Sequence, residues 1–545
     1  MKVATFLRIG LLIDDWTVPQ WVYRIVADIQ SSEIARISVV IKNADPPAPP
    51  RSLWRKVLSY RKELLYLLVK KLDELKNRAE PNAFEPMNLK PLLDDCPVVS
   101  VLPRKEKYDD YFEEGDLARI LEYDLDVALR FGFNILKGGV LQIARHGIWS
   151  YHHGDNRTHR GGPAGFWEVM EGEPTTGSIL QVLSPRLDDG KILYRSYAAT
   201  DPFSVTKNRN NYYWKSSAFV MRKLEDLAEE GPEGLDHETT AADRPPSGRP
   251  IYKIPTNRRM LELLGGWIKR YAGCQIKKIF FQEQWFLAFG LKGHFTPLLP
   301  PRDRFWADPF PIKKEDKYFV FIEEYLEKTK KGHISVIEID PNGRWSRPVK
   351  VLEKDYHLAY PFVFEWQGEY YMLPETSSQK TLELYRCRSF PHQWQLEKVL
   401  MEGVNAVDAT LAEMEGSWWL FVNMAAVAGN VKNWDELYLF YADHPLGPWK
   451  PHRRNPVKSD VRNSRPAGRV FSENGRFFRP AQDCSKRYGY AISINQILRI
   501  SPTDYEEKEV SKILPQWRKD LMGNHTFNRM EGLTVLDGLI RRPRW

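Results

Sequence analysis

The sequence predicts a multidomain protein in which an α/β domain is followed by an all-β domain of five propeller blades. In the first half of the chain, apolar strand segments alternate with amphipathic helical segments, and in the second half short aromatic strands recur between turn signals. A chain of 545 residues is also too long for a single core. We expect the α/β domain over residues 1–229, a linker with a short helix over 230–277, and the propeller over 278–545.

The α/β domain is predicted from the order of its segments. Residues 8–14 are expected to form a buried strand, residues 18–30 a helix and residues 37–41 a second strand. Three more strands, separated by helical stretches, are expected at residues 97–102, 127–131 and 147–151. This alternation predicts a mostly parallel sheet that binds ligands at the carboxyl ends of its strands. No GxGxxG motif follows the first strand, so dinucleotide binding is not favoured.

Two further segments interrupt this pattern. Residues 44–90 read as an insertion, with a proline-rich start and a long basic segment whose leucines recur at helical spacing. We interpret this segment as a packed helix with one solvated face; a helix that docks a partner is the alternative. Residues 230–250 are polar and rich in proline and glycine, which predicts a linker, and residues 258–272 predict a short helix.

The propeller is predicted from an internal repeat. Units made of two aromatic strands around a turn begin at Trp306, Tyr360, Val407 and Ser464, which are 54, 47 and 57 residues apart. Repeats of about 40 to 50 residues with several strands each are typical of β-propellers. We expect a fifth blade to form where residues 279–289 pair with residues 525–540.

Composition restricts the classes of function. The net charge of +8 arises from 79 basic and 71 acidic residues that are interleaved, so neither nucleic-acid binding nor membrane binding is implied, and no nucleic-acid partner is expected. The four cysteines form no CxxC pair, which argues against a disulfide scaffold or a zinc site, and no metal is expected. Because no apolar run approaches about 20 residues, we expect a cytoplasmic protein without a membrane span.

The candidate site of the first domain lies between residues 147 and 194. His152 stands at the end of a predicted strand, and Arg160 and Gly161 follow in a loop. Asp188 comes 36 residues after His152, in an acidic turn that leads into another predicted strand. Polar residues gathered between buried strands indicate a site rather than a core.

This pattern resembles the catalytic domain of the folate-dependent formyltransferases, a family that includes methionyl-tRNA formyltransferase and the sugar N-formyltransferases. His152 falls on the family's catalytic histidine, the Arg160–Gly161 pair on its Arg-Gly motif and Asp188 on its catalytic aspartate. Ser150 occupies the position of the family's asparagine. The resemblance covers about residues 8 to 200 and implies a Rossmann-like fold with 10-formyltetrahydrofolate as the cofactor.

The resemblance also implies roles for these side chains. As an amine attacks the formyl carbon, His152 would accept its proton, and Asp188 would fix the tautomer of that histidine. The Ser150 hydroxyl, a backbone N–H or His153 would replace the asparagine as the oxyanion donor. Loop residues would line the folate pocket, and others would contact the substrate: Arg130, Phe131, Gly132 and Asn134 for the cofactor, and His153, Asp155 and Arg160 for the substrate. The alternative is that the histidines and these loop residues only shape turns.

The propeller units carry acidic residues at corresponding places, namely Asp308, Glu375, Asp408 and Asp483. We expect Asp308, Glu375 and Asp408 to converge on the central channel and to contact a sugar. The strings WADPF, YPF, LPETS and HTFN resemble the glycosidase-like propeller at the N-terminus of plant glucosamine inositolphosphorylceramide transferases. Two carboxylates could support glycoside hydrolysis; the alternative is that they cap turns and tie blades together.

Together these observations predict an N-formyltransferase that acts on a small amino sugar, either nucleotide-linked or glycan-borne, with the propeller as a carbohydrate-recognition module. Two alternatives remain open. One is a glycoside hydrolase that uses the propeller beside a degenerate first domain, and the other is a protein that binds glycans without catalysis. Methionyl-tRNA is disfavoured as a substrate, because no basic and aromatic RNA-binding surface is evident.

Overall fold

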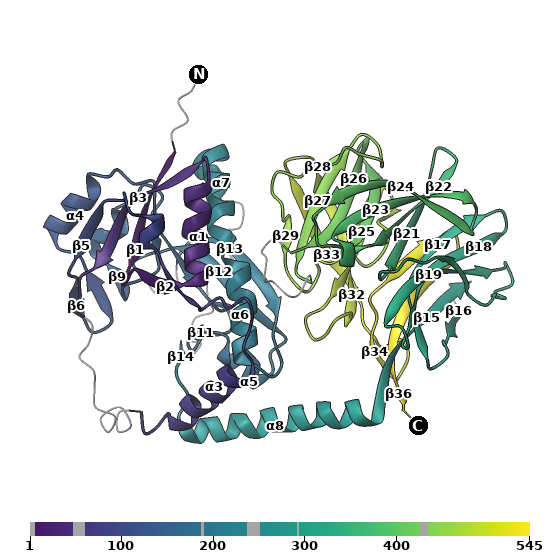
Figure 1. Ribbon diagram of the computed structural model, residues 1–545, viewed down its shortest axis with the longest axis horizontal. Coiled ribbons are helices and arrows are strands. Elements are labelled where there is room, and N and C mark those ends of the chain that lie inside the picture. The colour runs from purple at the N-terminus through teal and green to yellow at the C-terminus, as the bar shows by residue number, and fades with distance from the viewer. Residues whose placement is uncertain are drawn as a thin grey trace. The chain divides into compact units, whose positions relative to one another are not determined.

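The computed structural model describes residues 6–46, 60–186, 190–236, 251–291, 294–425 and 434–544. These residues form two compact units, one built mainly from residues up to Arg270 and the other mainly from Tyr271 onward. The first unit mixes helices with strands, whereas the second consists almost entirely of strands (Figure 1).

A seven-stranded sheet forms the centre of the first unit, in the order β13-β12-β10-β8-β1-β3-β5. The five strands from β10 to β5 are parallel to their neighbours, and β12 is antiparallel to β10. The mostly parallel sheet predicted from the sequence is therefore present. Its strands are β1 (Leu7–Ile13), β3 (Ala35–Asn43), β5 (Val98–Val101), β8 (Val127–Arg130), β10 (Ile148–His152), β12 (Thr175–Val182) and β13 (Ile192–Ala199).

Helices cover both faces of this sheet because its central strands are apolar on both sides. In β1, Ile9 and Leu11 pack into a core with Ile25 of α1 (Gln20–Ser31) and Leu224 of α7 (Phe219–Glu230). Leu12 points to the opposite face and packs into a second core, which includes α4 (Glu114–Leu121). This alternation follows from the two-residue period of a strand.

The connection between β8 and β10 differs from the prediction. A helical stretch was expected there, but the structure has the short strand β9 (Ile135–Lys137) and a 3-10 turn (Gly138–Gln142). Gly138 has a φ of 77°, and two adjacent glycines disfavour a helix. The strand β9 joins a small sheet with β6 (Arg104–Glu106) and β7 (Asp109–Tyr111).

Two further helices lie in the insertion and the linker. Within the predicted basic segment, α3 spans Leu64–Lys76, whereas residues 47–59 lie outside the described residues. The helix α8 (Asn257–Phe280) continues through Gly273 and ends eight residues beyond the predicted end at Ala272. The shorter elements are β2 (Thr17–Pro19), β4 (Pro86–Asn88), β11 (Arg160–Gly161), β14 (Ile251–Tyr252), α5 (Phe166–Glu171) and α6 (Val205–Ser216).

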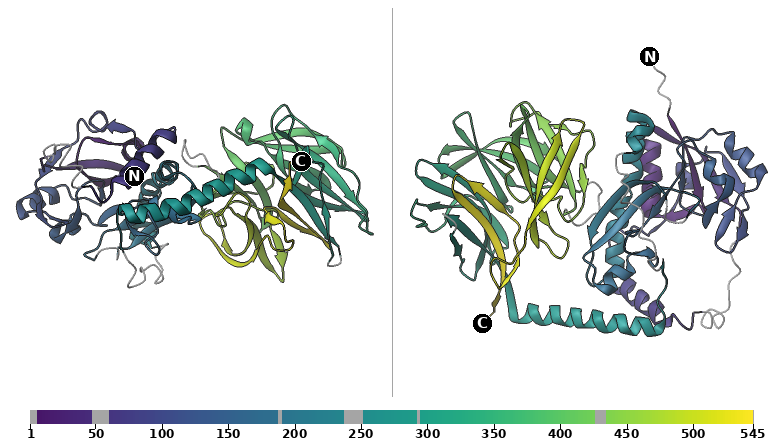
Figure 2. Two further views of the ribbon diagram at one scale, coloured as in Figure 1. Left: turned by 90° about the horizontal axis from the view of Figure 1, so that it is seen from below. Right: turned by 180° about the vertical axis from the view of Figure 1, so that it is seen from behind.

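The second unit consists of five antiparallel sheets, as predicted for a five-bladed propeller (Figure 2). Four blades follow one another along the chain, with inner strands β17 (Arg304–Lys314), β21 (Ala359–Trp366), β25 (Ala406–Met414) and β30 (Phe471–Glu473). Their remaining strands are β18 (Lys317–Leu326), β19 (Lys331–Ile339), β20 (Val349–Leu352), β22 (Glu369–Glu375), β23 (Thr381–Ser389), β24 (Gln393–Glu402), β26 (Ser417–Met424), β27 (Glu436–Ala442), β28 (Lys450–Pro451), β29 (Lys458–Ser459), β31 (Arg476–Asp483), β32 (Ala491–Ile500) and β33 (Tyr505–Ile513).

The fifth blade joins two distant parts of the chain. The strand β15 (Phe281–Leu291) pairs along its whole length with β36 (Leu533–Pro543), which also pairs with β34 (Leu521–Gly523) and β35 (Phe527–Met530). On its other side β15 pairs with β16 (His294–Leu298). The predicted closure of the fifth blade is confirmed.

Candidate functional site

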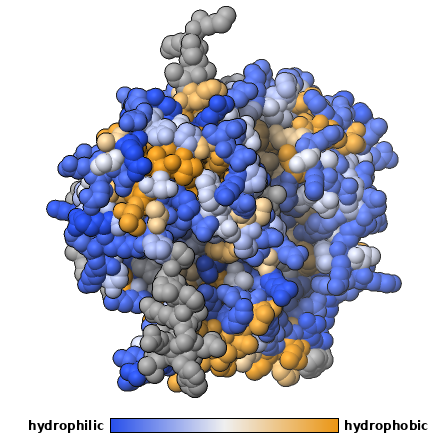
Figure 3. Space-filling view, turned by 60° about the vertical axis from the view of Figure 1, so that its left-hand side comes forward, coloured by the Kyte–Doolittle hydropathy of each residue, from blue (hydrophilic) through white to orange (hydrophobic). Residues whose placement is uncertain are grey.

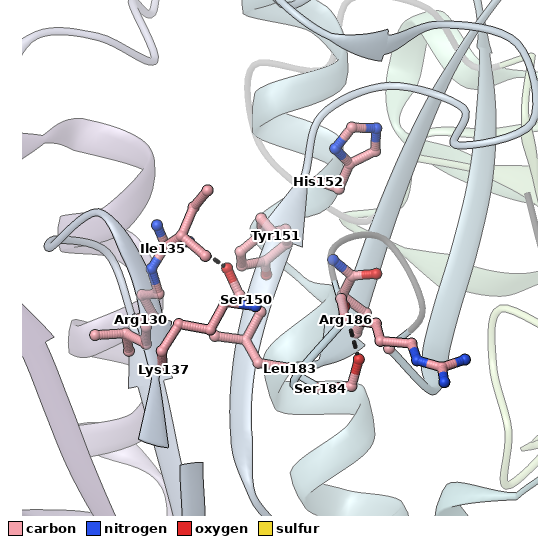
Figure 4. A pocket seen from close by; sticks show the side chains of 12 residues that line it. Arg130, Ile135, Lys137, Ser150, Tyr151, His152, Leu183, Ser184 and Arg186 are labelled. Atoms are coloured by element: carbon pink, nitrogen blue, oxygen red, sulfur yellow. Dashed lines mark hydrogen bonds between the residues drawn. The ribbon is translucent and has the colours of Figure 1, made fainter. Parts of the chain in front are cut away.

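A pocket of the first unit lies where two neighbouring parallel strands end. The register places Ser150 of β10 opposite Arg130 of β8, and His152 ends β10. All three residues line a cavity of about 160 Å³ (Figure 4). The remaining lining residues are Ile135, Leu136, Lys137, Tyr151, Gln181, Leu183, Ser184, Arg186 and Gly190. The pocket thus occupies the sheet edge at which the sequence predicted a ligand site.

Arg130 forms part of the pocket wall and is held there by three hydrogen bonds. One of its terminal nitrogens, Nη1, donates to Ser150 Oγ at 3.0 Å. The other, Nη2, donates to the backbone carbonyls of Phe133 at 3.1 Å and Asn134 at 2.7 Å. Burial lowers the pKa of Arg130 from its ordinary value, while Asp14 and Asp110 oppose this effect. The guanidinium therefore presents a fixed positive charge beside the serine hydroxyl.

The loop from Arg130 to Asn134 is fixed from behind by two carboxylates. Asp14 accepts a hydrogen bond from the Phe133 backbone at 2.8 Å, and Asp110 accepts two from Asn134, at 2.8 and 3.1 Å. Gly132 passes so close to the chain that a Cβ there would lie 2.5 Å from the Asp14 nitrogen. Of the four residues predicted to bind the cofactor, Arg130 lines the pocket, whereas Phe131, Gly132 and Asn134 form the loop behind it.

Two of the three predicted catalytic residues, Ser150 and His152, line the pocket. Ser150 is buried on β10 and His152 lines the same pocket two residues later, so that both side chains point to one side of the strand. A Cβ at Gly154 would lie 3.0 Å from the His159 carbonyl oxygen and 3.1 Å from His152 Nε2, so a side chain there would crowd the imidazole. Asp188 lies outside the described residues, so its predicted contact with His152 stays a prediction.

The residues predicted to contact the substrate in this domain do not line the pocket. His153 is stacked on Tyr213 with ring centroids 3.7 Å apart, and its Nε2 lies 3.1 Å from Ser216 Oγ. Burial lowers the pKa of His153 well below its ordinary value, so the ring is neutral. Asp155 binds Arg195 at 3.1 Å, and Arg160 belongs to β11. The geometry gives His153 a packing role instead of the predicted donor role.

A second cluster of polar side chains lies in the propeller. The inner strands of three blades each skip two residues in their register, at Asp308–Pro309, Tyr360–Pro361 and Asp408–Ala409. The first residue of each pair adopts a positive φ, namely 51°, 42° and 55°. Such conformations are strained for residues other than glycine and tend to occur at functional sites. A bulge of the same kind thus occurs in three blades and sets the direction of the side chains of Asp308, Tyr360 and Asp408.

Asp308 is linked to two neighbouring blades. It accepts hydrogen bonds from the Tyr360 backbone at 3.2 Å and from Thr526 Oγ1 at 2.6 Å, and it lies 3.5 Å from His525 Nε2. Burial raises the pKa of Asp308 to about 6, although the charge of His525 opposes this effect. Burial would lower the pKa of His525, but Asp537 at 2.6 Å and Asp308 outweigh it and raise that pKa to about 9.

Asp408 forms the other half of the cluster. Its carboxylate binds Arg465 through two oxygens, at 2.5 and 3.2 Å, and accepts a hydrogen bond from Gln482 at 2.8 Å. Arg465 also lies 3.9 Å from Glu375. Burial raises the pKa of Asp408 to about 6, with Arg465 acting in the opposite direction and Glu375 adding to the rise.

The predicted carboxylates Asp308, Glu375 and Asp408 therefore share one buried cluster, as their mutual electrostatic effects also indicate. Sequence reasoning missed four of its members, namely Glu323, Arg465, His525 and Asp537. Burial and the surrounding carboxylates raise the pKa of Glu323 well above its ordinary value. Asp308, His525 and Asp537 also bring ligand atoms within 4.8 Å of one another, a set that could hold a cation. Carboxyl groups with raised pKa values could donate protons near neutral pH.

Residues 300–532 match the family described as glucosamine inositolphosphorylceramide transferase 1, N-terminal. Two proteins named glucosamine inositolphosphorylceramide transferase 1, from Oryza sativa subsp. japonica and Arabidopsis thaliana, are each 37% identical to this chain over 229 and 227 residues. The propeller resembles the N-terminal part of those transferases. The alignments cover 42% and 41% of this chain but 30% and 29% of the relatives, so the chain spans about a third of their length.

Two solved structures resemble parts of this chain at low identity. An exo-1,5-alpha-L-arabinanase from a bovine ruminal metagenomic library is 14% identical, with 44% of this chain and 94% of that chain covered and a TM-score of 0.32. Glycinamide ribonucleotide transformylase 1 from Symbiobacterium toebii is also 14% identical, with 41% and 89% covered and a TM-score of 0.28. Neither likeness carries a functional argument at these TM-scores.

Proposed function

We propose that the first unit transfers a formyl group from 10-formyltetrahydrofolate to the amine of an amino sugar. The single observation that carries this proposal is the pocket at the carboxyl ends of β8 and β10, where Ser150 and His152 occupy the positions that the family resemblance assigns to catalysis. When bound, the folate would supply the formyl group. Arg130, which lines the pocket, would contact the folate, and its fixed guanidinium fits a ligand with polar oxygen atoms.

The hydrogen bond from Arg130 explains how serine could serve in place of asparagine. Because Ser150 Oγ accepts a hydrogen bond from Arg130 Nη1, the serine keeps its own O–H to donate toward the pocket. That O–H would stabilise an oxygen on which negative charge develops, and the neighbouring guanidinium would add to the effect. His152, on the same side of β10, would take the proton that the attacking amine releases at one of its ring nitrogens.

The test is a formyl-transfer assay of the full chain with a panel of nucleotide-linked and free amino sugars, read by mass spectrometry. We expect transfer to at least one acceptor, and a loss of about 100-fold in rate for His152→Ala and for Ser150→Ala. Ser184→Ala is the matched control, because Ser184 lines the same pocket and, among the residues that the structure describes, its hydroxyl donates only to the Arg186 carbonyl. A folded protein that binds no folate analogue and formylates no acceptor would contradict the proposal.

For the propeller we propose carbohydrate recognition, supported by its buried carboxylate cluster and by its likeness to a transferase named for a glycosylated lipid. Glycoside hydrolysis is the second candidate. The observation that favours it is that Asp308 and Asp408 occupy the same bulge in two blades and belong to one polar cluster, where a pair of carboxylates could serve as acid and base. If Asp308→Asn abolishes glycan hydrolysis and leaves glycan binding intact, the second candidate is correct.

A further inference from the structure

The helix α8 carries an apolar stripe along its whole length. Leu261, Ile268, Ile276 and Ile279 are each more than half exposed, and Gly265 and Ala272 are exposed between them. The steps between these six positions are three or four residues, so they all lie on one side of the helix. The buried side of α8 is a different one, where Met260 and Leu263 pack into a core with Tyr66.

Basic side chains accompany this stripe. The helix holds six cationic residues and one carboxylate, which gives it a net charge of +5. Arg258 and Arg259 form ion pairs with Glu262, and Arg259 also binds Glu171 at 2.9 Å. Within the described ranges, Lys269, Lys277 and Lys278 make no ion pair, so their charges are available to a partner.

A second helix repeats the pattern next to the start of α8. On α3, Leu68, Leu72 and Leu75 are more than half exposed. The helix carries three lysines and two carboxylates, and Glu74 pairs with both Lys70 and Lys71, so the contribution of α3 is mainly apolar. The Asn257 side chain joins the two helices, because it accepts from the Leu65 backbone at 2.9 Å and donates to the Arg61 carbonyl at 2.7 Å. In Figure 3, apolar residues gather along the lower edge, which is where α3 and α8 lie in Figure 1.

We infer that α8, together with α3, binds the surface of a membrane that carries anionic lipids. A helix with an apolar stripe beside lysines and arginines lies in the plane of a bilayer, with its apolar side chains in the boundary region and its cations at the headgroups. A second copy of the chain is the less favourable occupant, because each α8 helix has a net charge of +5 and two such helices repel each other. The inference does not depend on formyl transfer, and the proposed contact is a surface one: no helix of the described chain is long and apolar enough to span a membrane.

The test is co-sedimentation of the full chain with vesicles of phosphatidylcholine, with and without phosphatidylserine as the minority lipid. We expect binding only to the vesicles that contain phosphatidylserine, and weaker binding as salt is raised. The paired change Lys269→Gln with Lys277→Gln should lower the partition coefficient about tenfold or more. Leu261→Ser with Ile268→Ser should lower it similarly, since it removes apolar area from the bilayer.

Matched controls distinguish binding through this surface from non-specific binding to vesicles. Leu121→Ser removes a leucine of α4 that is also more than half exposed, and Lys508→Gln removes an exposed lysine of β33. Both controls should bind vesicles like the unchanged protein. Equal binding to neutral vesicles would overturn the inference. An absence of vesicle binding would also overturn it. Analytical ultracentrifugation would then show whether the apolar stripe instead joins two copies of the chain, in a dimer that Leu261→Ser with Ile268→Ser dissociates.

Discussion

Arg130 Nη1 donates a hydrogen bond to Ser150 Oγ across 3.0 Å, from one parallel strand to its neighbour. The two residues face each other in register, and both line the pocket that contains His152. A positively charged donor therefore orients the hydroxyl at the position where the formyltransferases that the sequence resembles have an asparagine. This relationship leads to the first prediction.

If Arg130 acts by orienting Ser150, the two residues are energetically coupled. Arg130→Met should lower the rate of formyl transfer by about 10-fold to 100-fold, whereas in a Ser150→Ala background the same change should have much less effect. The rates of the two single variants and the double variant form the measurement. Effects that simply add would contradict the orienting role, and circular dichroism would verify that each variant is folded.

Gly132 should tolerate no side chain. In Gly132→Ala the new Cβ would meet the Asp14 backbone at 2.5 Å, so the pocket loop must shift, and the free energy of unfolding should fall by about 1–3 kcal/mol. Binding of a folate analogue should weaken as well. Gly115→Ala is the control, because nothing lies within 4 Å of a Cβ at that position. Urea denaturation and calorimetric titration measure the two effects, and equal stability of both variants would refute the packing argument.

Arg465 should be essential to the stability of the propeller. Arg465→Leu leaves the Asp408 carboxylate buried without its cation, which should lower the free energy of unfolding by about 3–5 kcal/mol. Arg499→Leu breaks the pairs of an exposed arginine with Asp504 and Glu506 and should cost at most about 1 kcal/mol. Adding Asp408→Asn to Arg465→Leu should restore part of the loss. Denaturant unfolding gives these values, and a similar cost for both arginines would disprove the argument.

His525 should make the stability of the propeller depend on pH. Its folded pKa of about 9 exceeds the ordinary value of 6.5, so protonation stabilises the folded state. This contribution is complete below pH 6.5 and is lost as the pH rises through about 9. His525→Gln should flatten the decline in the free energy of unfolding over this interval. Asp308 and Asp408, whose pKa values are raised to about 6, change the free energy of unfolding only at lower pH. Unfolding curves at several pH values provide the measurement, and an unchanged slope in the variant would contradict it.

Local sequence patterns predicted the arrangement of each unit well. Runs of apolar residues located β1, β3, β8 and β10, and the repeat of aromatic strands located the blades, because each pattern is set by neighbours in the chain. The alternation of a strand also bears on the two adjacent histidines. Because Ser150 and His152 share one side of β10, the next residue, His153, points to the other side, which disfavours it among the three oxyanion donors that were considered.

Contacts between distant residues were beyond local patterns. Asp308 and Asp537 are 229 residues apart, yet the Asp308 backbone donates to the Asp537 carboxylate at 3.2 Å. Nothing near Arg465 indicates that it binds Asp408. Tyr360 was not recognised as the counterpart of Asp308 and Asp408, because its side chain is not acidic and only the backbone bulge relates the three positions. Its hydroxyl nevertheless connects Thr410 with the Gly468 backbone.

The pairing of β15 with β36 has a consequence for synthesis on the ribosome. The first strand of the ring, β15 (Phe281–Leu291), pairs with β36 (Leu533–Pro543), which is synthesised more than two hundred residues later. Until then β15 has one unpaired edge, which could pair wrongly with another chain. Long-range pairing of this kind also slows folding. The nascent propeller is therefore most vulnerable to aggregation just before its last strand emerges, and a chaperone that shields strand edges would act at that moment.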